Sequence, residues 1–329
     1  MRFSTYVAAV AWAFLLGSTV ATPIRREKRE DVGAEEKKLT PEEQQRLKYF
    51  HEPGDGDVMG HYDARYFRNI VSDEERTETQ LHMIRAYLGW FRDHNLDTWI
   101  AHGTLLGWWW NGKRLPWDWD LDTQVSGSTL AYMGERYNQT RYKYNPGDGK
   151  PEREYLLDIN PMIIERERGD GMNVIDARWI DVSNGLFVDI TGLSETHPDT
   201  NPGEWVCKNY HRYATSDLYP MRETMFEGVV AKVPYSYDKI LVQEYEEKAL
   251  VVTEFQGHVW SPQQKLWEKT PWQIEQDRKE AEKRKQEEEG RRQEEEQRRQ
   301  DDIVRKMEEE ELKKKAAQEE ELNNIMMGA

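Results

Sequence analysis

The chain is organised around one stretch, Ile100-Ala-His-Gly-Thr-Leu-Leu-Gly-Trp-Trp-Trp-Asn-Gly-Lys-Arg-Leu-Pro-Trp-Asp-Trp-Asp-Leu-Asp-Thr-Gln-Val125. It ends in three carboxylates at alternating positions, Asp118, Asp120 and Asp122. If residues 117–125 form a strand, alternate side chains share a face, so the three carboxylates project together. Like charges held this close repel one another, and a hard divalent cation such as Mg²⁺ or Mn²⁺ relieves the repulsion. The alternation therefore predicts a metal site.

A candidate phosphate site lies upstream of these aspartates. Gly103 and Thr104 form a polar turn, and Lys113 and Arg114 lie between that turn and the acids. Backbone N–H groups beside a glycine, a hydroxyl and cationic side chains can hold a phosphate next to a metal. Asp-x-Asp alone is common and usually solvated, but aspartates are disfavoured in strands, and here they alternate with residues such as Trp119. The combination favours metal-assisted transfer of a phosphoryl-type group.

The two halves of this stretch resemble the signature of the LicD/fukutin family. These halves are His102-Gly-Thr-Leu-Leu-Gly107 and, after a short spacer, Pro116-Trp-Asp-x-Asp-x-Asp122. The resemblance implies an α/β (α+β) fold, with a nucleotidyltransferase-like mixed sheet flanked by helices. It also implies transfer of a phosphorylated group from a nucleotide donor to a glycan.

A further aspartate interrupts the apolar run Gly185-Leu-Phe-Val-Asp-Ile-Thr191. A lone acid there is costly unless it has a partner. In nucleotidyltransferase-like folds a third carboxylate comes from a neighbouring strand, and this run resembles that element. We therefore prefer Asp189 to Asp181, which lies beside a Ser-Asn-Gly turn and is more simply explained as solvated. The predicted metal ligands are Asp118, Asp120, Asp122 and Asp189, of which Asp120, Asp122 and Asp189 are also the predicted catalytic residues.

Residues 217–235 resemble the C-terminal block of the same family, in which a strand pair precedes a helix, expected here at 237–247. Arg212 and Arg222 lie in or near this block. An arginine suits bidentate phosphate binding, although ordinary salt bridges explain either residue equally well. The donor-binding set predicted from both blocks is Gly103, Thr104, Lys113, Arg114 and Arg222. The general base stays open between the aspartates and His102.

Other elements follow from local patterns. A capping box, Ser72-Asp-Glu-Glu75, predicts the start of a helix whose apolar stripe includes Leu81, Ile84 and Leu88. Strands are expected at 96–101, 155–159, 173–175 and 177–182. Residues 104–110 are expected to form a short helix that ends at Asn111-Gly112.

Composition excludes several classes of protein and site. Of 329 residues 33% are charged, with a net charge of −16, which disfavours nucleic acid and anionic membranes as partners. A single cysteine, Cys207, excludes an intrachain disulfide and any zinc site built from several cysteines. An acidic protein that handles an anionic nucleotide needs a metal between them.

Four regions are expected along the chain. Residues 1–21 read as an export signal, either cleaved or kept as a membrane anchor, which predicts the secretory pathway and the Golgi lumen. Residues 22–60 read as a flexible stem and residues 61–272 as the catalytic domain. The Asn138-Gln-Thr140 sequon is usable if the protein is exported. Residues 273–329 form a charged, low-complexity helical tail, with opposite charges at i,i+4 spacing and no heptad seam.

Lys/Glu-rich tails also occur in the fungal LicD-type proteins linked to mannosylphosphorylation of glycans. That resemblance implies transfer of mannose 1-phosphate from a nucleotide-sugar donor to a mannan acceptor, with the tail available for a protein partner. Two alternatives stay open. One is transfer of another substituent, such as phosphocholine or a polyol phosphate. The other is a non-catalytic regulator that uses the same fold.

Overall fold

The computed structural model describes residues 40, 46–56, 58–147, 149–169 and 171–327. The expected export signal and most of the expected stem lie outside the described residues. From Pro41 onward the chain forms one compact unit in the pattern of its contacts. No helix among the described residues combines the length and the apolar character needed to cross a membrane.

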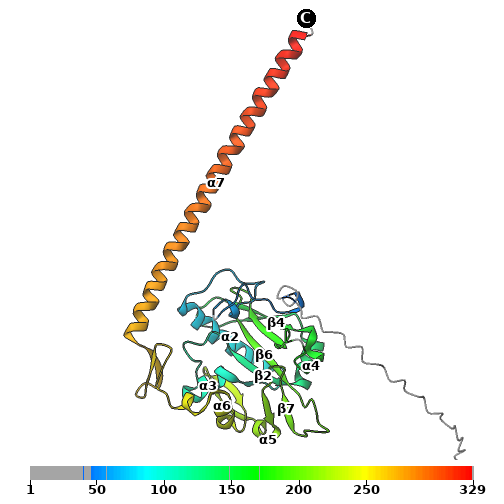
Figure 1. The fold of residues 1–329 in the computed structure, drawn as a ribbon, viewed down its shortest axis with the longest axis vertical. Helices are drawn as coiled ribbons and strands as arrows, with labels where there is room; N and C mark the ends of the chain where they lie inside the picture. The colour runs from blue at the N-terminus through cyan, green and yellow to red at the C-terminus, as the bar shows by residue number, and fades with distance from the viewer. Residues whose placement is uncertain (1–39, 41–45, 57, 148, 170, 328–329) are drawn as a thin grey trace, which may run out of the picture. The chain divides into compact units, whose positions relative to one another are not determined.

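The core of the domain is a mixed sheet of six strands with helices around it (Figure 1). Its strand order is β1-β2-β6-β5-β4-β3, in which only β2 and β6 pair in parallel. The predicted mixed α/β architecture is therefore confirmed. The strands are β1 (Trp99–Ile100), β2 (Asp122–Ser126), β3 (Thr140–Tyr144), β4 (Arg153–Ile159), β5 (Ala177–Asp181) and β6 (Phe187–Leu193).

One face of this sheet packs on the long helix α2 (Asp73–Asp93). As predicted, Ser72 caps the helix: its side chain accepts a hydrogen bond from the backbone N–H of Glu75 at 3.2 Å. Tyr87 lies fully buried against Trp179 of β5, and its hydroxyl accepts a hydrogen bond from Thr123 of β2 at 2.8 Å. Because side chains alternate along a strand, the neighbours of Thr123 and Trp179 point to the opposite face.

That opposite face carries a row of charges across four adjacent strands. The register places Asp122 of β2 beside Asp189 of β6, Asp189 beside Arg178 of β5, and Arg178 beside Asp158 of β4. The segment before α2 covers part of this row. The Tyr49 hydroxyl donates to Asp158 at 2.8 Å, and Glu52 pairs with Arg178 at 2.7 Å.

The expectation of a flexible stem up to residue 60 is therefore wrong for its C-terminal part. Phe50 is only 2% exposed, and the guanidinium of Arg178 lies 4.8 Å from its ring centroid. The backbone N–H of Tyr49 donates to the side chain of Asn173 at 3.0 Å. Asn173 is thus engaged by the incoming chain, and the strand expected at 173–175 is not formed. The folded domain begins before residue 61.

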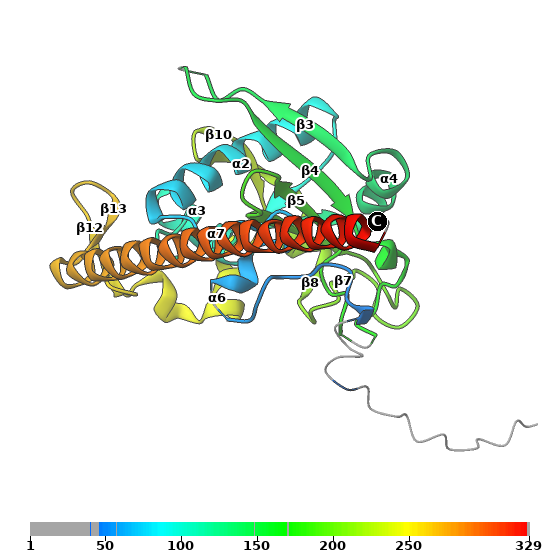
Figure 2. The same ribbon diagram turned by 90° about the horizontal axis from the view of Figure 1, so that it is seen from above.

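Smaller elements complete the domain, and Figure 2 shows it after a 90° turn. The helices are α3 (His102–Asn111), α4 (Gly127–Arg136), α5 (Thr215–Leu218) and α6 (Tyr237–Tyr245), with 3-10 turns η1 (Met59–His61), η2 (Pro161–Ile164) and η3 (Glu247–Leu250). The hairpins are β7 (Glu204–Val206) with β8 (Arg212–Ala214), and β9 (Arg222–Phe226) with β10 (Val229–Val233). A three-stranded sheet of β11 (Glu254–Phe255), β12 (His258–Ser261) and β13 (Leu266–Lys269) follows.

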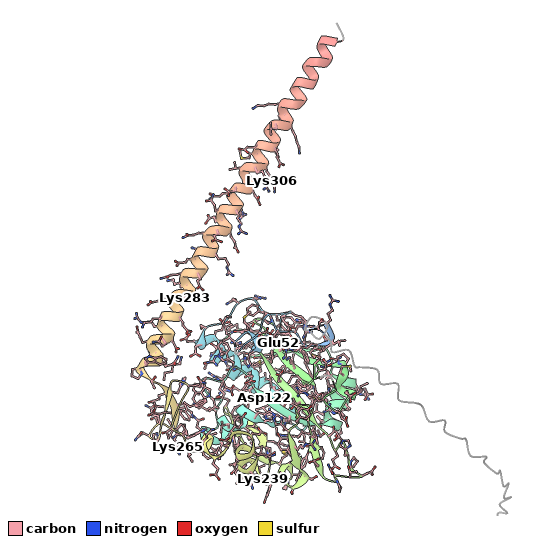
Figure 3. The ribbon with its side chains drawn as sticks, viewed as in Figure 1. Glu52, Asp122, Lys239, Lys265, Lys283 and Lys306 are labelled. Carbon is pink, nitrogen blue, oxygen red and sulfur yellow. The ribbon has the colours of Figure 1, made fainter. Side chains whose placement is uncertain are left out.

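The predicted helical tail is confirmed as α7 (Pro271–Met327), one uninterrupted helix of 57 residues. It continues through Gly290, where fraying was expected. Figure 3 shows its side chains, Lys283 and Lys306 among them, standing off the helix. Ion pairs at i,i+4 spacing support it, such as Arg278 with Glu282 at 3.2 Å and Lys283 with Glu287 at 3.6 Å.

Candidate active site

The site begins where β2 and β6 lie side by side in parallel. Asp122, the first residue of β2, is the register partner of Asp189 in β6. Both side chains point away from α2 and are half-buried. Two carboxylates that are far apart in the sequence thus meet as cross-strand neighbours on one face.

The other two aspartates precede the strand instead of belonging to it. The strand expected from residue 117 starts only at Asp122, because the carbonyls before it are bonded to side chains of α2. Arg76 donates to the carbonyl oxygens of Pro116 at 2.7 Å and Asp118 at 2.6 Å, and Gln80 donates to that of Trp119 at 2.8 Å. Asp118 and Asp120 therefore lie on an ordered loop that leads into β2.

The Gly-Thr turn, expected to bind phosphate, contacts the aspartates directly. The Thr104 hydroxyl accepts a hydrogen bond from the backbone N–H of Asp122 at 2.8 Å. A Cβ on Gly103 would lie 2.5 Å from Oδ2 of Asp118, so any larger residue there would displace that carboxylate. At the other end, the predicted C-cap of α3 is present: Gly112 has φ 73° and its N–H donates to the carbonyl of Trp108.

The electrostatics of the cluster show mutual repulsion. Burial and the nearby Asp120 charge raise the pKa of Asp118. Burial, Asp120 and Asp189 likewise raise the pKa of Asp122. Burial also raises the pKa of Asp189, although Arg178 donates to its Oδ1 at 2.8 Å. Bound cations favour the ionised form of such carboxylates, so a cation would stabilise the cluster.

Asp120 behaves differently because of a histidine. Burial opposes its ionisation, but the nearby His61 and Asp118 side chains together outweigh that effect and lower the pKa of Asp120 to about 2. The His61 Nε2 atom lies 3.7 Å from Oδ2 of Asp120. Among the four aspartates, the ionised form is therefore most favoured at Asp120.

Asp120, Asp122 and Asp189 line one cavity of about 660 Å³, a volume typical of sites for small molecules. Figure 3 shows Asp122 in the middle of the folded domain. Arg212 also lines this cavity and pairs with Glu204 at 3.0 Å. The remaining walls come from the β7–β8 hairpin, the end of α6 and strand residue Thr191.

None of the five predicted donor-binding residues lines this cavity. The Arg114 guanidinium bonds Thr77 of α2, and its backbone N–H donates to Glu227 at 2.9 Å. Arg222 lies over the rings of Tyr235 and Tyr237, and Lys113 is exposed on the turn after α3. Arg114 and Arg222 contact other side chains and Lys113 faces solvent. None of the three is therefore placed to bind a donor in this cavity.

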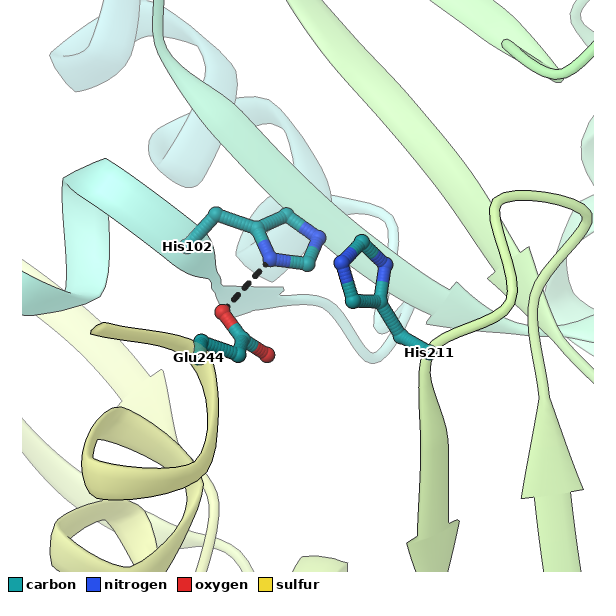
Figure 4. Close-up of side chains that lie close together, drawn as sticks. All are labelled: His102, His211 and Glu244. Carbon is teal, nitrogen blue, oxygen red and sulfur yellow. Dashed lines mark hydrogen bonds and ion pairs between the residues drawn. The ribbon is translucent and has the colours of Figure 1, made fainter. Parts of the chain in front are cut away.

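A second cluster on the cavity wall was not predicted as a set. His102 Nδ1 lies 2.8 Å from Oε2 of Glu244 in α6, and the ring of His211 lies next to that of His102, with centroids 4.3 Å apart (Figure 4). Burial would raise the pKa of Glu244, but the hydrogen bond from His102 lowers it. Burial and the nearby His102 lower the pKa of His211.

These residues, with Arg178, were missed because no local pattern marks them. Glu244 lies on an ordinary amphipathic helix, and His211 lies in a loop between two short strands. Of the three residues in the cluster, only His102 was a candidate from the sequence, because it starts the Gly-Thr motif. The cluster depends on tertiary contacts between distant segments.

Comparison with known proteins agrees with the geometry. Residues 95–236 match the family described as LicD/FKTN/FKRP, nucleotidyltransferase domain. This stretch is a LicD-type domain. It includes the sheet from β1 to β6, all four aspartates, His102 and His211, whereas Glu244 lies beyond its C-terminal boundary.

Two curated relatives come from Saccharomyces cerevisiae. Mannosyltransferase regulator 4 is 31% identical over 233 residues, which are 68% of this chain and 19% of the relative. Mannosyltransferase regulator 14 is 36% identical over 155 residues, which are 45% of this chain and 16% of the relative. This chain therefore matches less than a fifth of the length of either relative, and their names describe those larger proteins.

Proposed function

We propose that the LicD-type domain is a metal-dependent phosphotransferase that moves a sugar phosphate, mannose 1-phosphate, from a nucleotide-sugar to a mannan. The single observation that carries this proposal is the convergence of Asp120, Asp122 and Asp189 on one cavity of suitable size. The mannose specificity rests on the family resemblance and on the two relatives, which are named as regulators of a mannosyltransferase.

The donor set fits a hard divalent cation. Asp120, Asp122 and Asp189 would hold Mg²⁺ or Mn²⁺, with Asp118 adding negative charge beside them, since carboxylate oxygens are the ligands these ions prefer. When bound, the cation would offset negative charge on the transferred phosphate. The raised pKa values of Asp118, Asp122 and Asp189 support this assignment, because the cluster lacks enough positive charge of its own.

The chain's own residues would position the two substrates. Thr104 and Gly103 hold the aspartate loop in place, and Arg178 orients Asp189. Arg212, on the cavity wall, is the arginine best placed for a donor phosphate. We also propose that the protein is exported and acts in the lumen of the secretory pathway, with a domain that starts before residue 61 and a charged tail after it.

The products distinguish this reaction from ordinary glycosyl transfer. In the proposed step, an acceptor hydroxyl attacks the phosphorus that bears the sugar, the bond to the leaving nucleoside monophosphate breaks, and the hydroxyl proton is released. Glycosyl transfer would release the nucleoside diphosphate instead. The test incubates the purified chain with Mn²⁺, a mannan oligosaccharide and a panel of nucleotide-sugars, then separates the nucleotides. We expect nucleoside monophosphate from one donor, lost in Asp122→Asn; diphosphate release would contradict the proposal.

A regulatory role is the second candidate, and the names of both relatives favour it. A regulator of this fold would bind the nucleotide-sugar and metal without turnover. Metal-dependent thermal stabilisation by a donor, with no nucleotide product over long incubation with acceptor, would favour regulation over catalysis.

A further inference from the structure

His102, His211 and Glu244 come from three separate segments and meet on one wall of the cavity (Figure 4). One ring nitrogen of each histidine and one carboxylate oxygen of Glu244 all lie within 4.8 Å of one another. All three side chains are partly buried, with 14% exposure for His102 and 9% for Glu244. The two rings lie side by side with their planes tilted by 40°, and the carboxylate lies next to His102.

This donor set differs in kind from the aspartate cluster. Oxygen-only clusters suit Mg²⁺ and Mn²⁺, whereas two imidazoles with one carboxylate suit zinc and similar transition metals. We propose that His102, His211 and Glu244 bind a zinc-class metal ion, separate from the cation of the aspartates. This proposal is independent of the proposed transfer reaction.

Neighbouring side chains already hold each proposed ligand. The Tyr213 hydroxyl donates to Oε1 of Glu244 at 2.7 Å, and the Cys207 sulfur lies 3.3 Å from His211 Nδ1. The Gln124 amide lies 3.3 Å from His102 Nε2. Such outer contacts orient metal ligands in proteins. Two ligands of one tetrahedral zinc lie roughly 3.3 Å apart at bond lengths near 2.0 Å, so modest side-chain rotations would close the site.

The backbone at the site is held in an uncommon conformation. His102 has φ 50°, and Tyr210, next to His211, has φ 66°. Glu246, just after Glu244, has φ 63°. Residues other than glycine rarely adopt such φ angles, and those that do cluster at functional sites. Positive φ therefore occurs at His102, next to His211 and two residues after Glu244.

The proposal changes the role of His102. As a metal ligand it would lose its Nδ1 proton or use Nε2, and it would not serve as a free general base. Three protein ligands leave a fourth position for water or a substrate oxygen, and the site borders the cavity. The ion would also link α3, the β7–β8 hairpin and α6.

The experiment measures metal content and spectrum on the full chain. The protein is stripped with a chelator, dialysed against Zn²⁺ or Co²⁺, and analysed by mass spectrometry for bound metal and by visible absorption for tetrahedral Co²⁺. We expect one tightly bound zinc and a tetrahedral cobalt spectrum. His211→Ala and Glu244→Gln should each weaken zinc binding at least tenfold. His197→Ala is the matched control, because His197 is 55% exposed and pairs only at the surface with Glu167.

One further variant separates the two proposed metal sites. Asp122→Asn should lose Mn²⁺-dependent stabilisation but keep zinc. If His211→Ala does not fold, as judged by circular dichroism, Glu244→Gln carries the test, because it preserves side-chain shape. Zinc binding unchanged in the ligand variants, or lost in Asp122→Asn alone, would overturn the proposal. Zinc binding by the unsubstituted chain without any release of nucleotide would overturn only the proposed function.

Discussion

Two opposing effects act on the pKa of Asp189: burial raises it and the neighbouring Arg178 lowers it. Arg178 donates to its Oδ1, and that arginine also pairs with Glu52, so its single charge is shared between two carboxylates. Burial leaves the pKa of Asp189 raised despite this arginine. Asp122 has no basic partner among its described contacts and has Asp189 as its strand neighbour. The aspartate cluster is thus under-neutralised at its centre, as a cation site requires.

Replacing Asp122 by asparagine should remove metal binding without destabilising the fold. The substitution removes one repelling charge from a half-buried cluster, so the melting temperature of the metal-free protein should stay the same or rise by a few degrees. For a domain of this size, such a rise corresponds to a gain of about 1 kcal/mol in the free energy of unfolding. Stabilisation by Mn²⁺, about 2.7 kcal/mol at a hundred times Kd, should disappear. Thermal unfolding with and without Mn²⁺ measures both. A clear fall in metal-free stability would show that Asp122 is structural.

Gly103 should matter for metal binding more than for stability. A Cβ there would push the Asp118 carboxylate aside, while alanine also stabilises the helix by about 0.5–1 kcal/mol. Gly103→Ala should therefore weaken Mn²⁺ binding and change the unfolding free energy by less than about 1 kcal/mol. Gly89→Ala in α2 is the control, since no atom outside its helix backbone and chain neighbours lies within 4 Å of the new Cβ. It should stabilise the protein and leave metal affinity unchanged. Equal metal affinity in both variants would contradict this interpretation.

At the scale of elements, strands and helices with strong local patterns were predictable from sequence. The capping box gave the start of α2, and the interrupted apolar run gave β6 with Asp189 inside it. The aspartate stretch failed as a strand because distant side chains decide its backbone: Arg76 and Gln80 take the carbonyls that a ladder would use. The His102–His211–Glu244 cluster was unpredictable for the same reason, since three segments must fold before it exists.

Arg76 should therefore control the aspartate loop. It is only 4% exposed, lies 4.5 Å from the ring centroid of Trp119, and donates to two loop carbonyls. Hydrogen bonds to charged groups contribute about 1.5–3 kcal/mol each, so Arg76→Met should destabilise the domain by about 3 kcal/mol and weaken Mn²⁺ binding. Arg92→Met, on the same helix and exposed, is the control. Chemical denaturation compares them, and equal stability of the two variants would contradict the assigned role.

At the scale of the whole molecule, α7 contributes little to the stability of the domain. Its described contacts with the rest of the chain lie near its start, where Lys269 pairs with Asp277 at 2.6 Å and with Asp73 of α2 at 2.5 Å. Beyond these residues its described side chains are exposed. The helix is thus attached to the domain through its first turns.

Two truncations should test this attachment. A chain that ends at Lys279 keeps Asp277 and should unfold within about 0.5 kcal/mol of the full chain. A chain that ends at Thr270 loses Asp277 and should lose up to about 1 kcal/mol more, the typical value of an exposed ion pair. Denaturant titration measures both. If the chain that ends at Lys279 aggregates or unfolds non-cooperatively, the distal part of α7 packs on the domain.

The parallel pairing of β2 with β6 also has a consequence for how the protein is made. Parallel strands need a long connection, and here β3, β4 and β5 lie between the two partners in the chain. Pairings of such high sequence separation form slowly, since loop closure must precede the contacts that reward it. A nascent chain therefore cannot assemble its aspartate site until β6 has been synthesised and has inserted beside β2. In refolding experiments, Mn²⁺ affinity should appear only with the slowest phase, so the site reports on completion of the native topology.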